Sequence, residues 1–317
     1  MKLNELPLVS IIVASYNHSN YLRRRLDSLI NQAYKSVEII VIDDCSTENN
    51  RDILVEYMGI SNVKILLNKK NEGWVKVSNK GVSYASGDFV IWANCDDFCA
   101  SNMVERLIFP MLHDPSIVAC FCRSYLIDAE DIIIGDDYSV RELAFKRICN
   151  NDVKINGDLM STFLYHSCVM PNLSSVLFRK NVLLAVGLHD ASYVANSDWD
   201  LFLKLARIGN FYYISEPLNY FRQHINTIRN TTKNLTTYKE YFHLLLSNLN
   251  HANFTNKFKI RVRVGSLLIR YLLIDTSGFI RNIKELYGYL YGLDKCVFPF
   301  IIISPFYEIY QRFRRGF

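Results

Sequence analysis

The chain has 317 residues, of which 50% are hydrophobic, 21% are charged, 13 are glycine and 7 are proline. These numbers exclude an intrinsically disordered chain, a collagen-like repeat and a small disulfide scaffold, and they suit one large domain or two closely packed ones. The net charge is only +5, from 36 Lys and Arg against 31 Asp and Glu. We expect no nucleic-acid partner, because such proteins carry a stronger, clustered basic excess. The balance is compatible with an anionic small substrate or an anionic membrane surface.

The eight cysteines are scattered, and they form neither a CxxC pair nor a Cys/His quartet. This spacing argues against a zinc site and predicts buried, reduced thiols of a cytosolic protein. No apolar run approaches the ~20 residues of a membrane span. Residues 6–14 resemble the apolar part of a secretory signal, but Glu5 stands where such a signal carries positive charge. We therefore expect a cytoplasmic protein in which residues 6–14 belong to a first core strand.

The first half of the chain alternates short, β-branched apolar runs with segments of helical periodicity. The expected strands are residues 8–14, 37–42, 63–67 and 88–93. The expected helices are residues 22–30, 49–58 and 74–85. Uninterrupted apolar runs are typical of strands that are buried on both faces. This half therefore predicts a mostly parallel α/β sheet with right-handed crossovers.

The second half of the chain has a less regular pattern. We expect strands at residues 117–122, 174–178, 211–214 and 218–224, and a hairpin or loop at residues 125–135. We expect a short helix that ends near residue 186 and further helices at residues 198–208, 260–274, 280–291 and 297–313. There is no internal repeat, and the pattern indicates one soft boundary, near residue 225.

Three polar clusters follow three of the predicted strands, at Ser15 to Asn20, Asp43-Asp44 and Asp96-Asp97. In an open α/β sheet, ligands bind outside the carboxyl ends of the strands. A single Asp-Asp pair is explained most simply as a helix cap or an Asx turn. Three clusters at one edge bring like charges together, which is unfavourable unless a cation or a donor-rich ligand separates them. The pattern therefore predicts a divalent metal and a ligand with NH or OH donors.

Residues 7–224 resemble the family 2 glycosyltransferases with the GT-A fold, a Rossmann-like, mixed and mostly parallel sheet with flanking helices. The matching stretches are SIIVASYN at 10–17, LDSL at 26–29 with Gln32, EIIVIDDCST at 38–47, NEG at 71–73 through NKG at 79–81, ASGD at 85–88 and Asp96-Asp97. The resemblance implies a nucleotide-sugar-binding half at residues 1–115 and an acceptor-binding half at 116–225. Residues 226–317 would form a C-terminal helical extension.

The resemblance assigns the donor nucleotide to the first half. It implies that Ala14, Ser15 and Tyr16 line the nucleotide pocket. Asp44 or its neighbour Asp43 would accept a hydrogen bond from the base, a role that suits a carboxylate facing a ring NH. Asn79, in the matching stretch 71–81, is assigned to the donor site on the same basis.

The resemblance also implies a metal site. Asp96-Asp97 resembles the family's metal motif, with Asn94 where many members have a first aspartate. Asp97 would bind Mg²⁺ or Mn²⁺, and Asp96 would lie near the ribose or the donor sugar. Hard carboxylate oxygens suit these cations, which would neutralise the diphosphate. His224, in the segment after the last predicted strand, would reach the metal or the diphosphate, although a single histidine is more often a packed or surface residue.

An inverting transfer needs a base opposite the leaving diphosphate. The segment SDWDLFLKL at residues 197–205 resembles the family's base-bearing helix, and it places Asp198 at the base position with Asp200 as the fallback. The plainer explanation is that Ser197 or Asp198 only caps the helix.

The expected function is a metal-dependent, inverting transfer from a nucleotide diphosphate sugar to an acceptor hydroxyl. The family implies a lipid-linked glycan acceptor in the synthesis of a bacterial surface polysaccharide, such as an O-antigen or capsule. The alternatives are a soluble or protein acceptor, or a catalytically inactive nucleotide-sugar-binding scaffold. The sequence has no GxGxxG, GxxxxGK or GxSxG motif, which argues against a dehydrogenase, a P-loop NTPase and a hydrolase.

The end of the chain combines apolar and aromatic residues with a basic terminus over residues 297–317. Two prolines, Pro299 and Pro305, interrupt this short segment and argue against a membrane span. One interpretation is interfacial attachment to an anionic membrane, at the cytoplasmic face of the inner membrane. The other is a helix packed against the catalytic domain or a second subunit.

Overall fold

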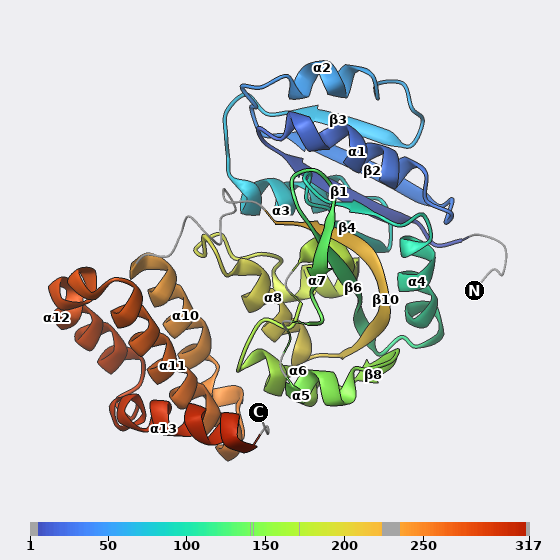
Figure 1. The fold of residues 1–317 in the computed structure, drawn as a ribbon. Helices are drawn as coiled ribbons and strands as arrows, with labels where there is room; N and C mark the ends of the chain where they lie inside the picture. Colours follow the sequence, from blue (N-terminus) through green and yellow to red (C-terminus); the bar gives the residue numbers. More distant parts are fainter. Residues whose placement is uncertain (1–5, 140, 142, 171, 224–234, 315–317) are drawn as a thin grey trace. The chain divides into compact units, whose positions relative to one another are not determined.

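The computed structural model describes residues 6–139, 141, 143–170, 172–223 and 235–314. The chain divides into two compact units (Figure 1). The first unit is Met1–Met160, Val169–Ser192 and Leu201–His224. The second unit is Ser161–Cys168, Tyr193–Asp200 and Ile225–Phe317. The division falls near residue 225 but also gives two earlier segments to the second unit, so the three-part domain organisation stays a prediction.

The first unit contains a mixed sheet in the strand order β3-β2-β1-β4-β9-β6-β10-β5, with β7 on β6 and β8 on β10. The strands are β1 (Val9–Ser15), β2 (Val37–Asp43), β3 (Val63–Leu67), β4 (Phe89–Trp92), β5 (Phe98–Cys99), β6 (Ile117–Ile127), β7 (Ile133–Asp136), β8 (Val153–Ile155), β9 (Val176–Arg179) and β10 (Asn210–Arg222). The strands β1 to β4 pair in parallel, as the first half of the sequence predicts. Their carboxyl ends consequently lie at one edge, with Ser15 of β1 beside Asp43 of β2.

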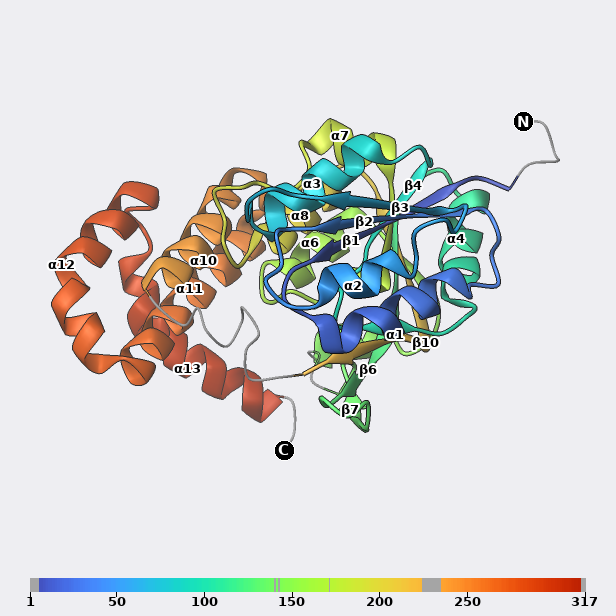
Figure 2. The same cartoon turned by 90° about the horizontal axis from the view of Figure 1, so that it is seen from above.

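Helices cover both faces of the parallel strands (Figure 2). The helices nearest these strands are α1 (Ser19–Ile30), α2 (Asn50–Val55), α3 (Trp74–Tyr84) and α4 (Met103–His113). The chain continues with α5 (Leu143–Ile148), α6 (Gly157–Leu164), α7 (Lys180–Val186) and α8 (Ser197–Ala206). The apolar faces of α1, α2 and α4 pack in one core with alternate residues of β1 and β2. On the other face α3 lies very close to β1, because a Cβ at Gly81 would come within 2.2 Å of the Ile12 side chain. Only glycine permits this approach.

The second half of the sheet differs from the sequence prediction in one strand. The sequence predicts two strands, at residues 211–214 and 218–224, but β10 is a single strand from Asn210 to Arg222. Its pairing with β6 shifts register on both sides of Pro217, which has no N–H to donate, so the strand is bulged and not interrupted. Part of the expected strand, His224, lies outside the described residues. The predicted hairpin at 125–135 is formed by β6 and β7.

The second unit contains a group of C-terminal helices, which confirms the predicted helical region. They are α10 (Leu235–Ser247), α11 (Phe254–Ile274), α12 (Thr276–Leu293) and α13 (Phe298–Arg314). The helix α13 packs closely on α11, where a Cβ at Gly265 would lie 2.7 Å from the Phe300 carbonyl oxygen. In the described part of the chain, no single helix is both long and apolar enough to cross a membrane.

Candidate active site

The loops after β1 and β2 are tied together by short polar side chains. Asn17 and Cys45 adopt positive φ angles of 52° and 64°, and the Asn17 side-chain oxygen accepts a hydrogen bond of 2.9 Å from the Thr47 amide. The Asn50 side chain donates to the Ser15 hydroxyl oxygen at 2.8 Å. The predicted nucleotide residues Ser15 and Tyr16 therefore stand on a braced frame, in which Ser15 is buried and Tyr16 is exposed. Ala14, next to them in β1, is half-buried.

Asp43 and Asp44 are both buried, and each accepts hydrogen bonds from its own surroundings. Asp43 accepts from the Ser46 amide at 3.1 Å, which holds the turn after β2. Asp44 accepts from the Asn68 side chain at 2.8 Å and from the backbone amides of Glu72 and Gly73 at 2.9 and 2.8 Å. Asp44 thus joins the ends of β2 and β3 to the start of α3. The role of either carboxylate at the nucleotide base stays a prediction.

Asn79, on α3, makes a reciprocal pair of hydrogen bonds with one backbone position. Its side-chain nitrogen donates to the His189 carbonyl oxygen at 2.8 Å, and its oxygen accepts from the His189 amide at 3.1 Å. The His189 ring is buried between Trp74 and Trp92, at 5.3 and 4.4 Å between ring centroids. These contacts give Asn79 a structural task, and its role at the donor stays a prediction.

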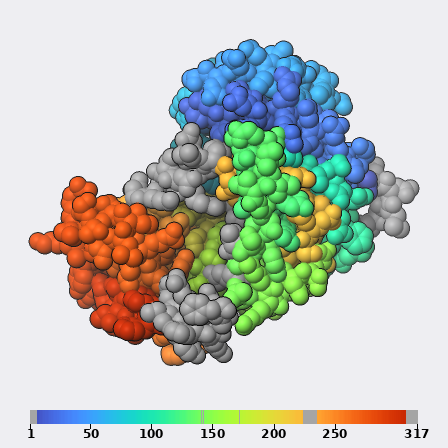
Figure 3. All heavy atoms as spheres, viewed as in Figure 1, coloured from blue at the N-terminus to red at the C-terminus, as the bar shows by residue number. Residues whose placement is uncertain are grey.

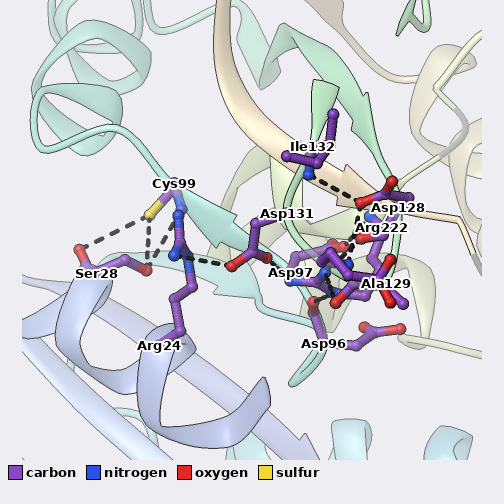
Figure 4. Close-up of polar contacts among 11 residues, drawn as sticks. Arg24, Ser28, Asp96, Asp97, Cys99, Asp128, Ala129, Asp131, Ile132 and Arg222 are labelled. Carbon is purple, nitrogen blue, oxygen red and sulfur yellow. Dashed lines mark hydrogen bonds and ion pairs between the residues drawn. The ribbon is translucent and has the colours of Figure 1, made fainter. Parts of the chain in front are cut away.

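Asp97, which Figure 4 shows beside Arg222, is only 1% exposed and accepts three hydrogen bonds. The Asn172 side chain and the Ser174 hydroxyl donate to one carboxylate oxygen at 2.7 and 2.6 Å, and the Arg222 amide donates to the other at 3.0 Å. Burial, followed by the charge of Asp96, raises the pKa of Asp97 to about 6. The nearby guanidinium of Arg25, completely buried on α1, opposes this shift. Asp97 therefore has a structural role: its buried carboxylate holds the Asp96-Asp97 turn to residues 172, 174 and 222.

Arg222, at the end of β10, organises this part of the site, although the sequence analysis did not identify it. Its guanidinium donates to the Asp96 carbonyl oxygen at 2.7 Å and to the Ala129 carbonyl oxygen at 3.1 Å. It also forms an ion pair with Asp131, which in turn pairs with Arg24 of α1 at 2.8 Å. Figure 4 shows these groups gathered between α1, the Asp-Asp turn and the β6–β7 hairpin.

Asp96 differs from Asp97 in its surroundings, because its side chain is only half-buried at the carboxyl edge of the parallel strands. Near it lies His18, another residue that the sequence analysis did not single out. A hydrogen bond to the Cys95 thiol and the negative charge of Asp96 raise the pKa of His18. The edge of the sheet therefore combines one accessible carboxylate with one imidazole that favours its cationic form.

Asp198 belongs to the second unit and lies in the first turn of α8. Its side chain is half-buried, and one carboxylate oxygen accepts from the Trp199 amide at 2.7 Å. Trp199 is buried and donates from its indole nitrogen to the Leu164 carbonyl oxygen at 2.8 Å. The fallback residue Asp200 is more deeply buried, 9% exposed. Asp198 as the base stays a prediction, as does His224, which lies outside the described residues.

The chain that leads into α8 is held by Glu240 of α10, which the sequence analysis also missed. One carboxylate oxygen of Glu240 accepts from the Val194 amide at 2.7 Å. The other accepts from the Ala195 amide and the Asn196 side chain, both at 3.0 Å. Glu240 is 8% exposed, so these bonds are shielded from water and fix the approach to Asp198.

A metal at this edge would depend on few protein ligands. In the ranges that the structure describes, no group of three or more His, Cys, Asp and Glu side chains could hold a metal ion. Mg²⁺ is commonly bound by one or two carboxylates together with substrate phosphates. The half-buried Asp96 fits this kind of site, in which the substrate supplies oxygen ligands.

The comparisons with known proteins agree with this arrangement. The model of the family "Glycosyl transferase family 2" matches residues 10–163. An uncharacterised glycosyltransferase of Rickettsia typhi is 31% identical over 72% of this chain and 68% of its own length. The family match covers the β1, β2 and Asp-Asp loops described above.

Solved structures share the fold. The S. aureus protein TarS (residues 1–349), in complex with UDP-GlcNAc, has a TM-score of 0.64 at 18% identity and covers 93% of this chain and 81% of its own. The mannosyltransferase PcManGT of Pyrobaculum calidifontis, in complex with GDP-Man and Mn²⁺, has a TM-score of 0.55 at 13% identity and covers 95% and 88%. These neighbours confirm the predicted GT-A fold. The family model and the Rickettsia relative show that the chain belongs to glycosyl transferase family 2.

Proposed function

We propose that this glycosyltransferase is metal-dependent and inverting, and that it moves a sugar from a nucleoside diphosphate sugar to a hydroxyl group of a lipid-linked glycan. The observation that carries the proposal is the pair Asp96-Asp97 at the carboxyl edge of the parallel strands. One carboxylate of the pair is accessible, and the other is buried and braced by three donors. The nucleotide sugars bound to TarS and PcManGT support the donor class.

We assign the metal-facing role to Asp96 and the bracing role to Asp97. This exchanges the roles that the resemblance alone implied, because three hydrogen bonds and burial leave Asp97 poorly placed to face a ligand. The Mn²⁺ bound to PcManGT supports a divalent cation. When bound, Mn²⁺ or Mg²⁺ would neutralise charge on the diphosphate leaving group. His18, held near its cationic form by its neighbours, would add positive charge at the same edge.

The transfer step needs a carboxylate on the acceptor side. In our proposal, the acceptor hydroxyl oxygen attacks the anomeric carbon while the bond from that carbon to the diphosphate oxygen breaks. Asp198 takes the hydroxyl proton, and Glu240 holds the loop that positions Asp198. Attack from the side opposite the leaving group inverts the configuration at the anomeric carbon.

The proposal is tested by thermal-shift measurements on the purified protein with UDP, GDP, dTDP and CMP, each with and without Mn²⁺. A ligand that binds the folded state raises the unfolding temperature by mass action. We expect one nucleoside diphosphate to raise it, and to do so only with the metal. A folded protein that responds to none of these nucleotides would contradict the proposed donor class and favour an inactive scaffold.

A further inference from the structure

The helix α12 carries an apolar stripe on its exposed side. Ile280, Ile283, Tyr287 and Tyr291 follow one another at intervals of three and four residues, which places them on one face of the helix. Their exposed fractions are 64%, 50%, 56% and 44%. The face of α12 beside the stripe is anchored in the second unit by the buried Leu286 and Leu290. The stripe is therefore a fixed surface feature of this unit, and part of α12 can be seen at the surface in the space-filling view (orange-red, Figure 3).

Basic residues accompany the stripe. Arg281 and Lys284 are exposed on α12 and lie along one flank of the apolar face. Over residues 254–307 the chain has eight Lys and Arg against three Asp and Glu, a difference that equals the net charge of the whole protein. Two of these acids are already paired, Asp294 with Arg261 and Glu285 with Lys239. Residues 254–307 therefore carry a net positive charge, to which Arg281 and Lys284 contribute beside the stripe.

An aromatic cluster marks the end of the stripe, where α12 turns into α13. The ring of Phe298 stacks on Tyr287 with 4.7 Å between centroids, and the Lys295 ammonium group lies 5.4 Å from the Tyr291 ring centroid. Tyrosine rings with a neighbouring lysine suit the boundary between lipid tails and headgroups, where one end of the side chain is apolar and the other is hydrated.

We propose that α12 lies in the plane of an anionic membrane surface, with its apolar stripe among the lipid tails and Arg281 and Lys284 at the headgroups. An anionic lipid surface is a better partner for the stripe than a second copy of this chain, because two copies would bring the positive charges of Arg281 and Lys284 together. The stripe is also narrow, one face of a helix about 27 Å long, whereas a stable protein interface buries about 800 Å² on each partner. An amphipathic helix with a basic flank is typical of interfacial binding.

This inference deepens the proposed function, because a lipid surface would bring the enzyme to a lipid-linked acceptor. It assigns the membrane surface to α12, whereas the sequence offered residues 297–317 as one of two interpretations, membrane attachment or packing against protein. Together, α12 and residues 298–307 of α13 are long and apolar enough for a membrane span, but the two helices meet at a bend of 97°. This bend suits a helix that lies along the membrane surface better than one that crosses the membrane.

Cosedimentation of the full-length protein with vesicles tests the inference without any donor or metal. We expect binding to phosphatidylcholine vesicles containing 30% phosphatidylglycerol, and much weaker binding to phosphatidylcholine alone or at high salt. Arg281→Gln with Lys284→Gln should weaken binding about fivefold for each charge removed. Ile280→Ser with Ile283→Ser should weaken it roughly tenfold or more, since both side chains are exposed in the free protein.

Matched controls are available in the first unit. Ile133→Ser with Ile134→Ser removes two equally exposed isoleucines, and Arg147→Gln with Lys64→Gln removes two exposed charges. Both controls should bind vesicles as the wild type does. Absence of binding to anionic vesicles would overturn the inference, as would an effect of the controls equal to that of the α12 variants. Sedimentation equilibrium tests the alternative occupant, a second copy of this chain. A wild-type dimer that becomes a monomer in the α12 variants would overturn the membrane inference. Nucleotide binding is measured separately, so a failure of the membrane inference would leave the test of the donor site unaffected.

Discussion

The backbone amide of Arg222 donates a hydrogen bond of 3.0 Å to the carboxylate of Asp97, which is 125 positions earlier in the chain. The Arg222 side chain also binds the carbonyl oxygen of the adjacent Asp96. Main chain and side chain of one residue thus fix the Asp-Asp turn against the end of β10. Because the turn is held from beneath, the carboxylate of Asp96 can face a ligand without the loop having to order on binding.

Arg222→Lys should destabilise the protein and weaken nucleotide binding. A lysine keeps the charge but has a single ammonium group, which cannot serve Asp96, Ala129 and Asp131 together. We expect a loss of about 2–4 kcal/mol in the free energy of unfolding and at least a tenfold weaker nucleotide affinity. Urea denaturation and calorimetric titration measure the two effects. The exposed Arg147→Lys is the control, and an unchanged affinity in Arg222→Lys would disprove the bracing role.

Asp97→Asn should remove a pH dependence of stability. Burial raises the pKa of Asp97 to about 6, so between about pH 4 and 6 the unfolded chain has released this proton while the folded chain retains it. Raising the pH through that window favours unfolding, by an amount on the order of 3 kcal/mol. The stability advantage of the wild type over Asp97→Asn should therefore narrow from pH 4 to pH 7.

Urea denaturation at four pH values measures this change. The exposed Asp88→Asn serves as the control and should show no such narrowing. A wild-type advantage that widens with pH would show that the pKa of Asp97 is lowered in the folded state, against the geometry described above.

Glu240→Gln should lower kcat and leave nucleotide affinity unchanged. Glutamine has one oxygen, whereas the two carboxylate oxygens of Glu240 accept from three N–H groups of residues 194–196. The NH₂ group of the new glutamine would then face a backbone or side-chain N–H that needs an acceptor, and residues 194–196, which lead to Asp198, would shift. We expect about a tenfold fall in kcat, because transfer depends steeply on the position of the base. Glu285→Gln, at a side chain 56% exposed, is the control. A raised KM for the donor with an unchanged kcat would refute the positioning role.

Asp198→Asn should abolish most transfer while nucleotide binding stays within about twofold of the wild type. Removing a general base typically costs a factor of roughly 10²–10⁴ in rate. Single-turnover transfer and nucleotide titration on the same preparation separate the two effects. Asp200→Asn is the matched comparison on the same helix turn, and a greater loss in Asp200→Asn would transfer the base assignment to Asp200.

The sequence predicted the parallel half of the sheet because its strands are short, mostly apolar and β-branched runs that alternate with segments of helical periodicity. It also placed Asp43, Asp44, Asp96 and Asp97 at the strand ends. It could not separate an accessible carboxylate from a buried one, since Asp96 and Asp97 are adjacent and chemically identical. Their difference comes from Asn172, Ser174 and Arg222, which the fold brings from distant positions.

Glu240 and the two-strand prediction for β10 illustrate the same limit. Nothing in the local sequence around Glu240 indicates that its carboxylate binds residues 194–196, about 45 positions away. In β10, the sequence predicts two strands, at residues 211–214 and 218–224, but a bulge against β6 at Pro217 lets one strand continue. Both features depend on pairing over long sequence separations, which short-range patterns do not contain.

Calorimetric titration of the nucleotide identified by the thermal-shift screen into wild type and Asp96→Ala, with and without Mn²⁺, tests the central claim most directly. We predict that Mn²⁺ strengthens binding to the wild type at least tenfold and that this gain is lost in Asp96→Ala, which removes the half-buried carboxylate. The folded state of the variant is checked by its unfolding temperature. A full metal effect in folded Asp96→Ala would contradict the donor site proposed here.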